Sequence, residues 1–189
     1  AVSELYKRLT LDRVLPNWWE AYGSSPAIAT EVRFEIPFDG ATLVGAIDRI
    51  GPHADGATRI TDFKTGRADR AEKPADSLQL GIYYLAVTLD PALEVFRPVR
   101  SVELAYLRGD DKDGTMPALA WPVSPAGEED YQGAVRERVS ELIDRVRELD
   151  AGGTYRPDPD ADCYFCDFKT LCPLFPEGRP LFATEGSTS

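Results

Sequence analysis

Three charged side chains, Asp48, Asp62 and Lys64, have the types and the spacing of a hydrolytic metal site. Each carboxylate ends a short β-like run, and the lysine stands two residues after the second carboxylate. Paired carboxylates bind hard divalent cations such as Mg²⁺ or Mn²⁺, and a bound cation activates water and offsets the charge of a scissile phosphate. A neighbouring lysine can orient or help deprotonate that water and stabilise developing negative charge. The combination indicates metal-dependent phosphodiester hydrolysis.

Two predicted strands would bring these side chains together. Both segments have the apolar content of strands and are separated by Gly and Pro, so an antiparallel pair is expected over residues 42–50 and 58–65. Because side chains alternate along a strand, Asp62 and Lys64 share one face and Phe63 points to the other. If the register sets Asp48 opposite Asp62, the two carboxylates converge, with the Phe63 carbonyl as a further hard oxygen ligand.

Each of these charges also has a structural interpretation. Lysines and carboxylates at strand ends commonly form ion pairs on the protein surface. The set of three favours a site instead, because two adjacent carboxylates repel each other unless a cation lies between them. Gly45 before the first carboxylate and Gly66 after the lysine complete the pattern.

A helix that follows the second strand carries two further candidates. Its apolar spacing predicts a start near Asp76, with Asp76 as the N-terminal cap. Gln79 and Tyr83 stand four residues apart and therefore lie on one face. A structural interpretation competes, since Gln79 could be the second member of a capping box and Tyr83 could belong to the core. Beside the Asp/Asp/Lys set, both residues are predicted to belong to the site.

The chain thus carries three short motifs in order: Gly45-x-x-Asp48-Arg49, Asp62-x-Lys64-Thr65-Gly66 and Gln79-x-x-x-Tyr83. In this combination they resemble the RecB-type branch of the PD-(D/E)XK nuclease superfamily. The resemblance runs from about Glu31 to Tyr83 and resumes at the C-terminal cysteines. It implies an α/β fold with a restriction-endonuclease-like core, in which helices flank a central mixed β-sheet. Ile47 replaces the proline of the superfamily's name, which is a common departure in this branch.

The resemblance implies roles for the matching positions. By this resemblance, Asp48, Asp62 and Lys64 are catalytic. The matching Gln79 and Tyr83 are expected to shape the site and contact DNA. Glu31 resembles an acidic family position upstream of the first Asp, which makes it a further candidate metal ligand. A solvated glutamate at the start of a strand is the competing interpretation.

Three cysteines, Cys163, Cys166 and Cys172, lie within ten residues of each other. An odd number excludes a complete internal disulfide scheme, so a metal or a cluster is indicated. Closed zinc sites and cubane clusters both need a fourth ligand. In the iron–sulfur, AddB-like branch of helicase-nucleases, a similar C-terminal motif forms part of a 4Fe–4S staple whose first cysteine lies far upstream. That cysteine is absent here, so a partial site, a remnant, or three reduced thiols around an aromatic turn remain alternatives.

The upstream histidine that commonly contacts the metal in this branch is absent as well. The one histidine, His53, lies downstream of the first carboxylate and is typical of a surface loop. We therefore expect a piece of a larger polypeptide whose preceding segment supplies the histidine and the fourth cysteine. Within this chain we predict a single nuclease domain over residues 1–189, with a catalytic core at 24–150 and a cysteine lobe at 157–176.

The composition predicts a globular intracellular protein. A chain of 189 residues with 43% hydrophobic and 28% charged residues can bury a substantial core. No apolar run approaches the ~18 residues of a membrane span, and the first residues do not follow a signal-peptide pattern. Clustered thiols suit a reducing cytoplasm.

The net charge of −11 opposes a nucleic-acid partner, because duplex DNA binding usually leaves a basic footprint. The conflict eases if a metal offsets the carboxylates and another domain or subunit, such as a helicase motor, delivers the strand. Basic residues do flank the site, and of these Arg49 and Arg67 are the predicted DNA contacts. Pairing with nearby carboxylates is the alternative for such residues.

Downstream segments extend the predicted core. Strands are expected over 101–108 and 119–123 as a hairpin, followed by a helix over 128–149 that packs on the sheet and ends before Gly152. The resulting hypothesis is a Mg²⁺- or Mn²⁺-dependent deoxyribonuclease, an exonuclease rather than an endonuclease, which serves a helicase-nuclease in recombinational repair. The alternatives are a CRISPR adaptation-type exonuclease and a catalytically inactive structural or DNA-docking module.

Overall fold

Five strands form one mixed β-sheet in a computed structural model that describes residues 8, 10–66, 73–109, 118–123, 128–153 and 172. The strands lie side by side in chain order: β1 (Ala29–Phe38), β2 (Ala41–Pro52), β3 (Thr58–Lys64), β4 (Val99–Tyr106) and β5 (Ala118–Pro122). Strands β3 and β4 are parallel, whereas the other neighbours are antiparallel. The predicted α/β fold with a mixed sheet is confirmed, as are the 42–50 with 58–65 pair and the later hairpin.

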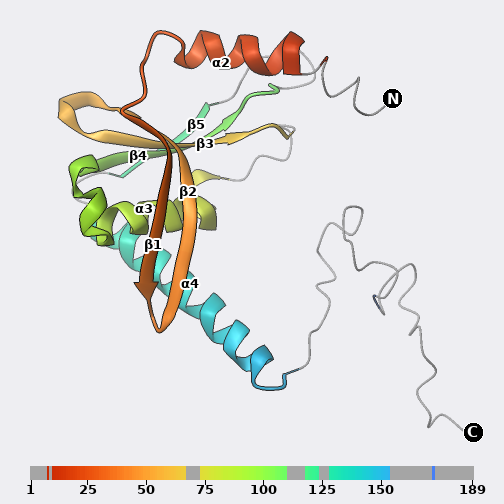
Figure 1. Ribbon diagram of the computed structural model, residues 1–189, viewed down its shortest axis with the longest axis vertical. Coiled ribbons are helices and arrows are strands. Elements are labelled where there is room, and N and C mark those ends of the chain that lie inside the picture. Colours follow the sequence, from red (N-terminus) through yellow and green to blue (C-terminus); the bar gives the residue numbers. More distant parts are fainter. Residues whose placement is uncertain are drawn as a thin grey trace, which may run out of the picture. The chain divides into compact units, whose positions relative to one another are not determined.

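Helices cover both faces of this sheet (Figure 1). They are α2 (Leu15–Tyr22), which follows a π-helical turn at Thr10–Val14, α3 (Leu78–Leu89) and α4 (Glu128–Asp150). Helix α2 lies on one face, where Tyr22 and Trp18 pack with Leu107 and Phe63. Helix α3 lies on the other face and supplies part of the main core. Because β3 and β4 are covered on both sides, most residues of β3 and nearly all residues of β4 are buried.

The start of α3 differs from the prediction. Ser77, not Asp76, is the N-cap: its backbone is extended, and its hydroxyl accepts the Leu80 N–H at 3.5 Å. Asp76 instead ends a 3₁₀ turn, and its carbonyl accepts a hydrogen bond from Arg138 of α4. Both residues are good capping types, and the preceding Pro-initiated turn decides between them. Gln79 therefore forms no capping box with Asp76.

Helix α4 shares the main core with the sheet and with α3. Val135 lies against Gly81 of α3, and the rings of Tyr131 and Tyr84 meet edge to face at 5.1 Å. The apolar stripe of α4 is buried along Val135, Val139 and Ile143. The apolar side chains of Leu142 and Val146 beside it are 44% and 49% exposed, so only part of the apolar surface of the helix is buried.

The chain divides into two compact units, residues 1–144 and 145–189. In the described part of the second unit, α4 ends where Gly152 adopts a left-handed φ of 99°, as its sequence predicts. Cys172 is half-buried and forms no disulfide. The predicted partners Cys163 and Cys166 lie outside the described residues.

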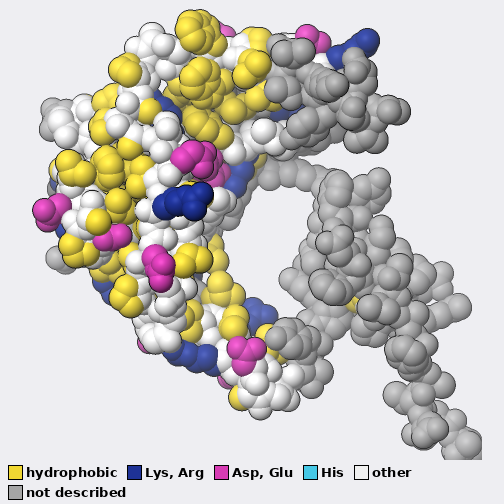
Figure 2. Space-filling view, viewed as in Figure 1, with side chains coloured by type: hydrophobic (Ala, Val, Ile, Leu, Met, Phe, Trp, Pro, Cys, Tyr) yellow, Lys and Arg dark blue, Asp and Glu magenta, His cyan; other side chains and the backbone are white. Residues whose placement is uncertain are grey.

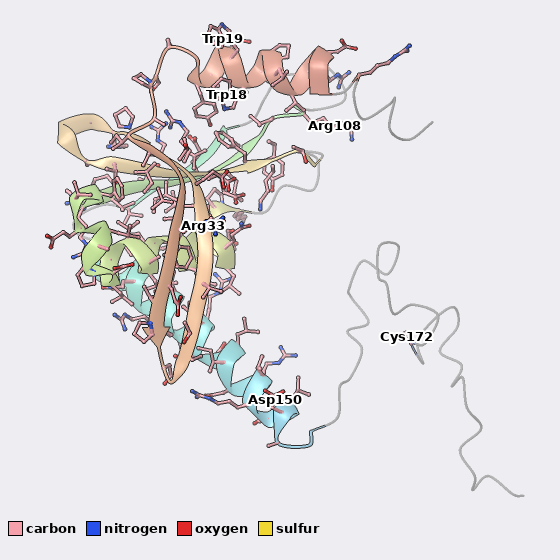
Figure 3. The ribbon with its side chains drawn as sticks, in the orientation of Figure 1. Trp18, Trp19, Arg33, Arg108, Asp150 and Cys172 are labelled. Atoms are coloured by element: carbon pink, nitrogen blue, oxygen red, sulfur yellow. The ribbon has the colours of Figure 1, made fainter. Side chains whose placement is uncertain are left out.

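The outer side of α2 is apolar and exposed. Trp18 points toward the sheet, whereas Trp19, which is 69% exposed, points away from it (Figure 3). Hydrophobic side chains gather over this helix in the space-filling view (Figure 2). In the part of the chain that the structure describes, no helix combines the length and the apolar content of a membrane span.

The close contact between α3 and α4 gives a test of the packing. A Cβ at Gly81 would lie 2.8 Å from a methyl group of the buried Val135. We expect Gly81→Ala to lower the free energy of unfolding by about 1 kcal/mol, because overpacking outweighs the gain in helix propensity. Urea denaturation would measure this, and a Val135→Ala change should relieve part of the loss.

Gly133 is the matched control on α4, since a Cβ there would meet nothing within 4 Å. Gly133→Ala should stabilise the protein by up to about 1 kcal/mol through helix propensity alone. Equal gains at both glycines would contradict the close packing of the two helices.

Candidate active site

The register of β2 and β3 brings the two predicted catalytic carboxylates together. Arg49 and Thr61 form the last pair of the β2–β3 ladder, and extending that register by one position sets Asp48 opposite Asp62. Residues directly opposite each other in an antiparallel pair share a face of the sheet. The backbone N–H of Phe63 donates to Asp48 Oδ2 at 2.8 Å, which ties the first carboxylate to the strand that bears the second. The register thus meets the condition that the sequence left open.

A third carboxylate extends this row onto β1. Val32 pairs with Ile47 and Thr30 pairs with Arg49, which leaves Glu31 opposite Asp48. Regular pairing is interrupted there, and Glu31 has a left-handed φ of 51°. Such a backbone costs about 1–3 kcal/mol in a residue other than glycine and is concentrated at functional sites. Glu31, Asp48 and Asp62 therefore stand in register across three neighbouring strands.

The irregularity also changes which way β2 faces. Ile47 and Ile50 are both fully buried in the main core, although residues three apart in a regular strand point to opposite faces. The alternation of side chains between the two faces is therefore interrupted between Ile47 and Ile50, in the segment that begins with Asp48. As a result, the Asp48 side chain can lie on the α3 face of the sheet although the preceding Ile47 side chain is buried on the same face.

A chain of polar contacts links the carboxylates to α3. Lys64 Nζ lies 2.7 Å from Asp62 Oδ2 and donates a hydrogen bond of 2.7 Å to Gln79 Oε1. Gln79 Nε2 in turn donates to the Tyr83 hydroxyl at 2.7 Å. The predicted sharing of faces by Asp62 with Lys64, and by Gln79 with Tyr83, is confirmed. Four of the predicted site residues are joined in one continuous array.

Burial differs along this array. Asp62 is 2% exposed and Tyr83 is 6% exposed, whereas the Lys64 side chain retains 31% of its surface and Gln79 is exposed. The ring of Tyr83 packs edge to face on Phe34 at 6.0 Å, so this residue belongs to the core and to the site at once. Both ends of the array are thus buried, and its middle, at Lys64 and Gln79, is open to a substrate.

The Tyr83 hydroxyl reports the charge of its surroundings. Burial raises the pKa of Tyr83, the hydrogen bond from Gln79 lowers it, and the carboxylates of Asp62, Asp48 and Glu31 raise it further. All three carboxylates of the row therefore act on one hydroxyl. Tyr83 keeps its proton throughout the neutral range and can donate it to an anionic group.

The donor set fits a hard divalent cation by its chemistry. The two carboxylates Asp48 and Asp62 lie opposite each other, and oxygen ligands are those that Mg²⁺ and Mn²⁺ prefer. Among the residues that the structure describes, no three His, Cys, Asp or Glu side chains are close enough to form a metal site by themselves. A cation here would therefore use two carboxylates, a backbone carbonyl and waters, which is a common arrangement for Mg²⁺.

The predicted DNA contact Arg49 lies on the opposite face of the sheet. It is 4% exposed, its guanidinium stacks 4.9 Å from the centre of the Tyr22 ring, and it donates to the Ser25 carbonyl at 2.8 Å. Burial lowers the pKa of Arg49. This placement favours a structural role over a DNA contact, because the side chain is not presented to solvent. The other predicted contact, Arg67, lies outside the described residues.

A buried glutamate on that face was not predicted. Glu103 of β4 is 2% exposed and accepts hydrogen bonds from Tyr22 at 2.7 Å and from Thr61 at 3.1 Å. Both faces of β4 are buried. A lone glutamate inside an otherwise apolar run was the available signal, since a strand buried on both faces reads as nearly continuous apolar sequence.

The fold and the site define a mixed-sheet protein with carboxylates on adjacent strands and a lysine two residues after the second of them. A sequence model of the PD-(D/E)XK nuclease superfamily matches residues 3–173. The chain belongs to that superfamily. The RecB-type branch and the iron–sulfur motif stay predictions.

Two curated relatives are each named "Gene 69 protein". The one from Mycobacterium phage D29 is 35% identical over 162 residues, which cover 83% of this chain and 51% of the relative. The one from Mycobacterium phage L5 is 33% identical over 152 residues, which cover 79% and 46%. This chain therefore spans about half the length of the curated relatives that it matches.

Among solved structures, the one described as "Crystal structure of SSO0001" is similar over 92% of this chain and 71% of its own. The identity is 18% and the TM-score is 0.48.

The electrostatic coupling of Tyr83 to the carboxylates can be measured in metal-free protein. Because a negative charge nearby raises the pKa of a phenol, Asp62→Asn should lower the pKa of Tyr83 relative to the wild type. NMR titration of ¹³C-labelled tyrosine would follow this. Tyr131 is the internal control: burial raises its pKa to about 12, and the Asp62 substitution should leave that value in place. An unchanged Tyr83 titration would refute the convergence of the row.

Proposed function

We propose that this chain hydrolyses DNA phosphodiester bonds in the presence of Mg²⁺ or Mn²⁺. The observation that carries the proposal is the continuous array from Asp62 through Lys64 and Gln79 to Tyr83, with Asp48 opposite its buried end. Membership of a nuclease superfamily supports the same reaction class. An inactive docking module has no physical need for this array, since the strained Glu31 backbone and the carboxylate pair both cost stability.

The side chains divide the work. Asp48 and Asp62 would hold the cation with the Phe63 carbonyl, and Glu31 stands ready as a further oxygen ligand. When bound, the cation would lower the pKa of a coordinated water and offset the charge of the scissile phosphate. The remaining steps fall to this chain's own donors on α3 and at the end of β3.

Lys64 is arranged as a donor rather than as a base. The Lys64 ammonium forms an ion pair with Asp62 and donates a hydrogen bond to Gln79. A further N–H can orient the attacking water or contact a phosphate oxygen, so Lys64 would stabilise the charge that develops in the transition state. Gln79 orients the lysine through its side-chain carbonyl. Its amide N–H donates to the Tyr83 oxygen, so the Tyr83 proton is available for a second phosphate oxygen.

Charge sets a limit on how the substrate arrives. The formal charge is −11, and the open groove of about 830 Å³ beside Glu31 is also lined by Glu35, Asp90 and the exposed Arg33 (Figure 3). Such a surface attracts a polyanion weakly. We therefore propose that another domain or subunit, a helicase motor, feeds DNA ends to this site for exonucleolytic resection in recombinational repair. A CRISPR adaptation-type exonuclease would use the same site with a different partner.

The cysteine motif leads to a separate proposal. Three thiols in ten residues, one of them the free and half-buried Cys172, would hold part of a 4Fe–4S cluster with a fourth ligand from outside this chain. Anaerobic purification followed by iron and sulfide analysis would test this. Absence of both elements from the full-length protein would reject the cluster and leave three reduced thiols.

Cleavage of end-labelled linear DNA tests the main proposal. The wild type should cut with Mg²⁺ or Mn²⁺ and not with EDTA, and Asp62→Ala should be inactive. Lys64→Ala should lose at least about 100-fold in rate, which is the usual effect of removing a donor that stabilises transition-state charge.

Lys73→Ala is the control for the lysine substitution, because Lys73 is exposed, lies nine residues further on and takes no part in the array. It should cut at the wild-type rate. Circular dichroism and urea denaturation would establish that each variant is folded. Wild-type rates in folded Asp62→Ala and Lys64→Ala proteins would overturn the assignment of the site.

A further inference from the structure

We propose that Tyr22 and Glu103, on the sheet face opposite the carboxylates, are positioning residues that hold Asp48 and Asp62 at the separation a divalent cation requires. We call this pair the rear clamp. The inference rests on the proposed function, because it assigns a task to residues that lie behind the same metal site. Its evidence is the way that the neighbours of both carboxylates are anchored.

The first anchor acts on β3 through Glu103. This side chain is 2% exposed at the centre of the sheet and accepts the Tyr22 O–H at 2.7 Å and the Thr61 O–H at 3.1 Å. Arg59 Nη1 lies 3.4 Å from its second oxygen. A buried carboxylate is tolerated only with such partners, and their geometry is then fixed by its position. Thr61 immediately precedes Asp62, so Glu103 holds the backbone on one side of that carboxylate.

The second anchor acts on the other side of Asp62. The ring of Phe63 meets the ring of Tyr22 edge to face at 5.3 Å. The N–H of the same Phe63 donates to Asp48 Oδ2, and its carbonyl is the proposed third ligand. Tyr22 thus fixes a residue whose main chain belongs to the site and whose side chain does not. Any shift of Tyr22 would move the N–H that orients Asp48.

The third anchor acts on β2. Arg49 follows Asp48, and its guanidinium lies between the Tyr22 ring, at 4.9 Å, and the Ser25 carbonyl, at 2.8 Å. Gly51 makes this possible, because a Cβ there would lie 2.0 Å from Arg49 Nη1. One tyrosine therefore contacts a neighbour of each catalytic carboxylate from behind the sheet.

These contacts oppose a repulsion that arises on the sheet face that carries the carboxylates. Opposed carboxylates repel each other, and a flexible strand pair would relax by moving apart. Arg49, Thr61 and Phe63, each adjacent to a carboxylate, project to the rear, where no ligand competes for them. The rear clamp uses these positions to resist the repulsion without occupying the site.

Tyr22→Phe is the primary test, because it removes one hydroxyl and keeps the aromatic contacts. Mn²⁺ binding is measured by electron paramagnetic resonance on DNA-free protein, alongside cleavage as a function of Mn²⁺ concentration. We expect the Kd for Mn²⁺ to rise about 10–100-fold, as for other residues that orient metal ligands. Glu103→Gln should act in the same direction, and excess Mn²⁺ should recover most of the cleavage rate.

Tyr131→Phe is the matched control. Its hydroxyl is buried without a hydrogen-bond partner among the described residues, and it lies on α4, so its loss breaks no contact to the sheet. It should bind Mn²⁺ like the wild type. Stability is measured for every variant, and a Tyr22→Phe protein that binds normally while unfolding more easily would show a merely structural role.

Gly51→Ala provides a second route in case Tyr22→Phe does not fold. The added methyl group displaces the end of the Arg49 side chain, which can move, and leaves Tyr22 and Glu103 in place. Weaker Mn²⁺ binding, with unchanged DNA binding in EDTA, is expected for Gly51→Ala and for Arg49→Met. The reverse pattern, with a loss of DNA affinity alone, would return Arg49 to the DNA contact that the sequence predicts.

The outcomes separate the two proposals. A wild type that cuts DNA and binds Mn²⁺, beside folded Tyr22→Phe and Glu103→Gln variants with wild-type Kd values, would overturn the rear clamp alone. A wild type that neither binds Mn²⁺ nor cuts DNA would overturn the proposed function, and the clamp with it.

Discussion

The structure depends on one electrostatic constraint, the placement of two carboxylates opposite each other on adjacent strands. Like charges on facing strands repel each other more strongly where the surroundings exclude water, and Asp62 is 2% exposed. Three features offset that repulsion in the described part of the chain. Lys64 lies against Asp62, the Phe63 N–H donates to Asp48, and the strands themselves are held from behind. The site is thus stable enough to form and still electrostatically prepared for a cation.

The sheet topology explains why the constraint can be met. Strand β3 lies at the centre of the sheet between an antiparallel and a parallel neighbour, with α2 on one face and α3 on the other. A central strand cannot drift, whereas β1 at the edge can accept the left-handed backbone of Glu31. The rigid carboxylate, Asp62, thus lies on a central strand, and the strained one, Glu31, lies on an edge strand. This arrangement is expected if Asp62 fixes the position of the site and Glu31 is a more adjustable ligand.

Local rules in the sequence recover the front of the site. Period-two alternation placed Asp62 and Lys64 on one face, and helical spacing placed Gln79 beside Tyr83, because both rules act within a few residues. The cap of α3 was assigned to Asp76 rather than to Ser77, since adjacent residues of similar propensity differ only in the turn before them. The rear of the site was not recovered at all. The burial of Glu103 and Arg49 depends on α2 covering that face, which no local pattern encodes.

The acidic surface and the carboxylate row are linked by the same electrostatics. A polyanion that enters the groove meets Glu31 and Glu35, so binding without a cation is opposed twice, by net charge and by local charge. A bound cation reduces the repulsion from the local carboxylates and leaves the repulsion from the net charge of the chain. Affinity for DNA should therefore be conditional on metal, and tight binding should require cationic surface from a partner. Under the proposed function, the acidic charge would make cleavage selective, because a strand would have to be delivered to the site and meet a bound metal to overcome both barriers.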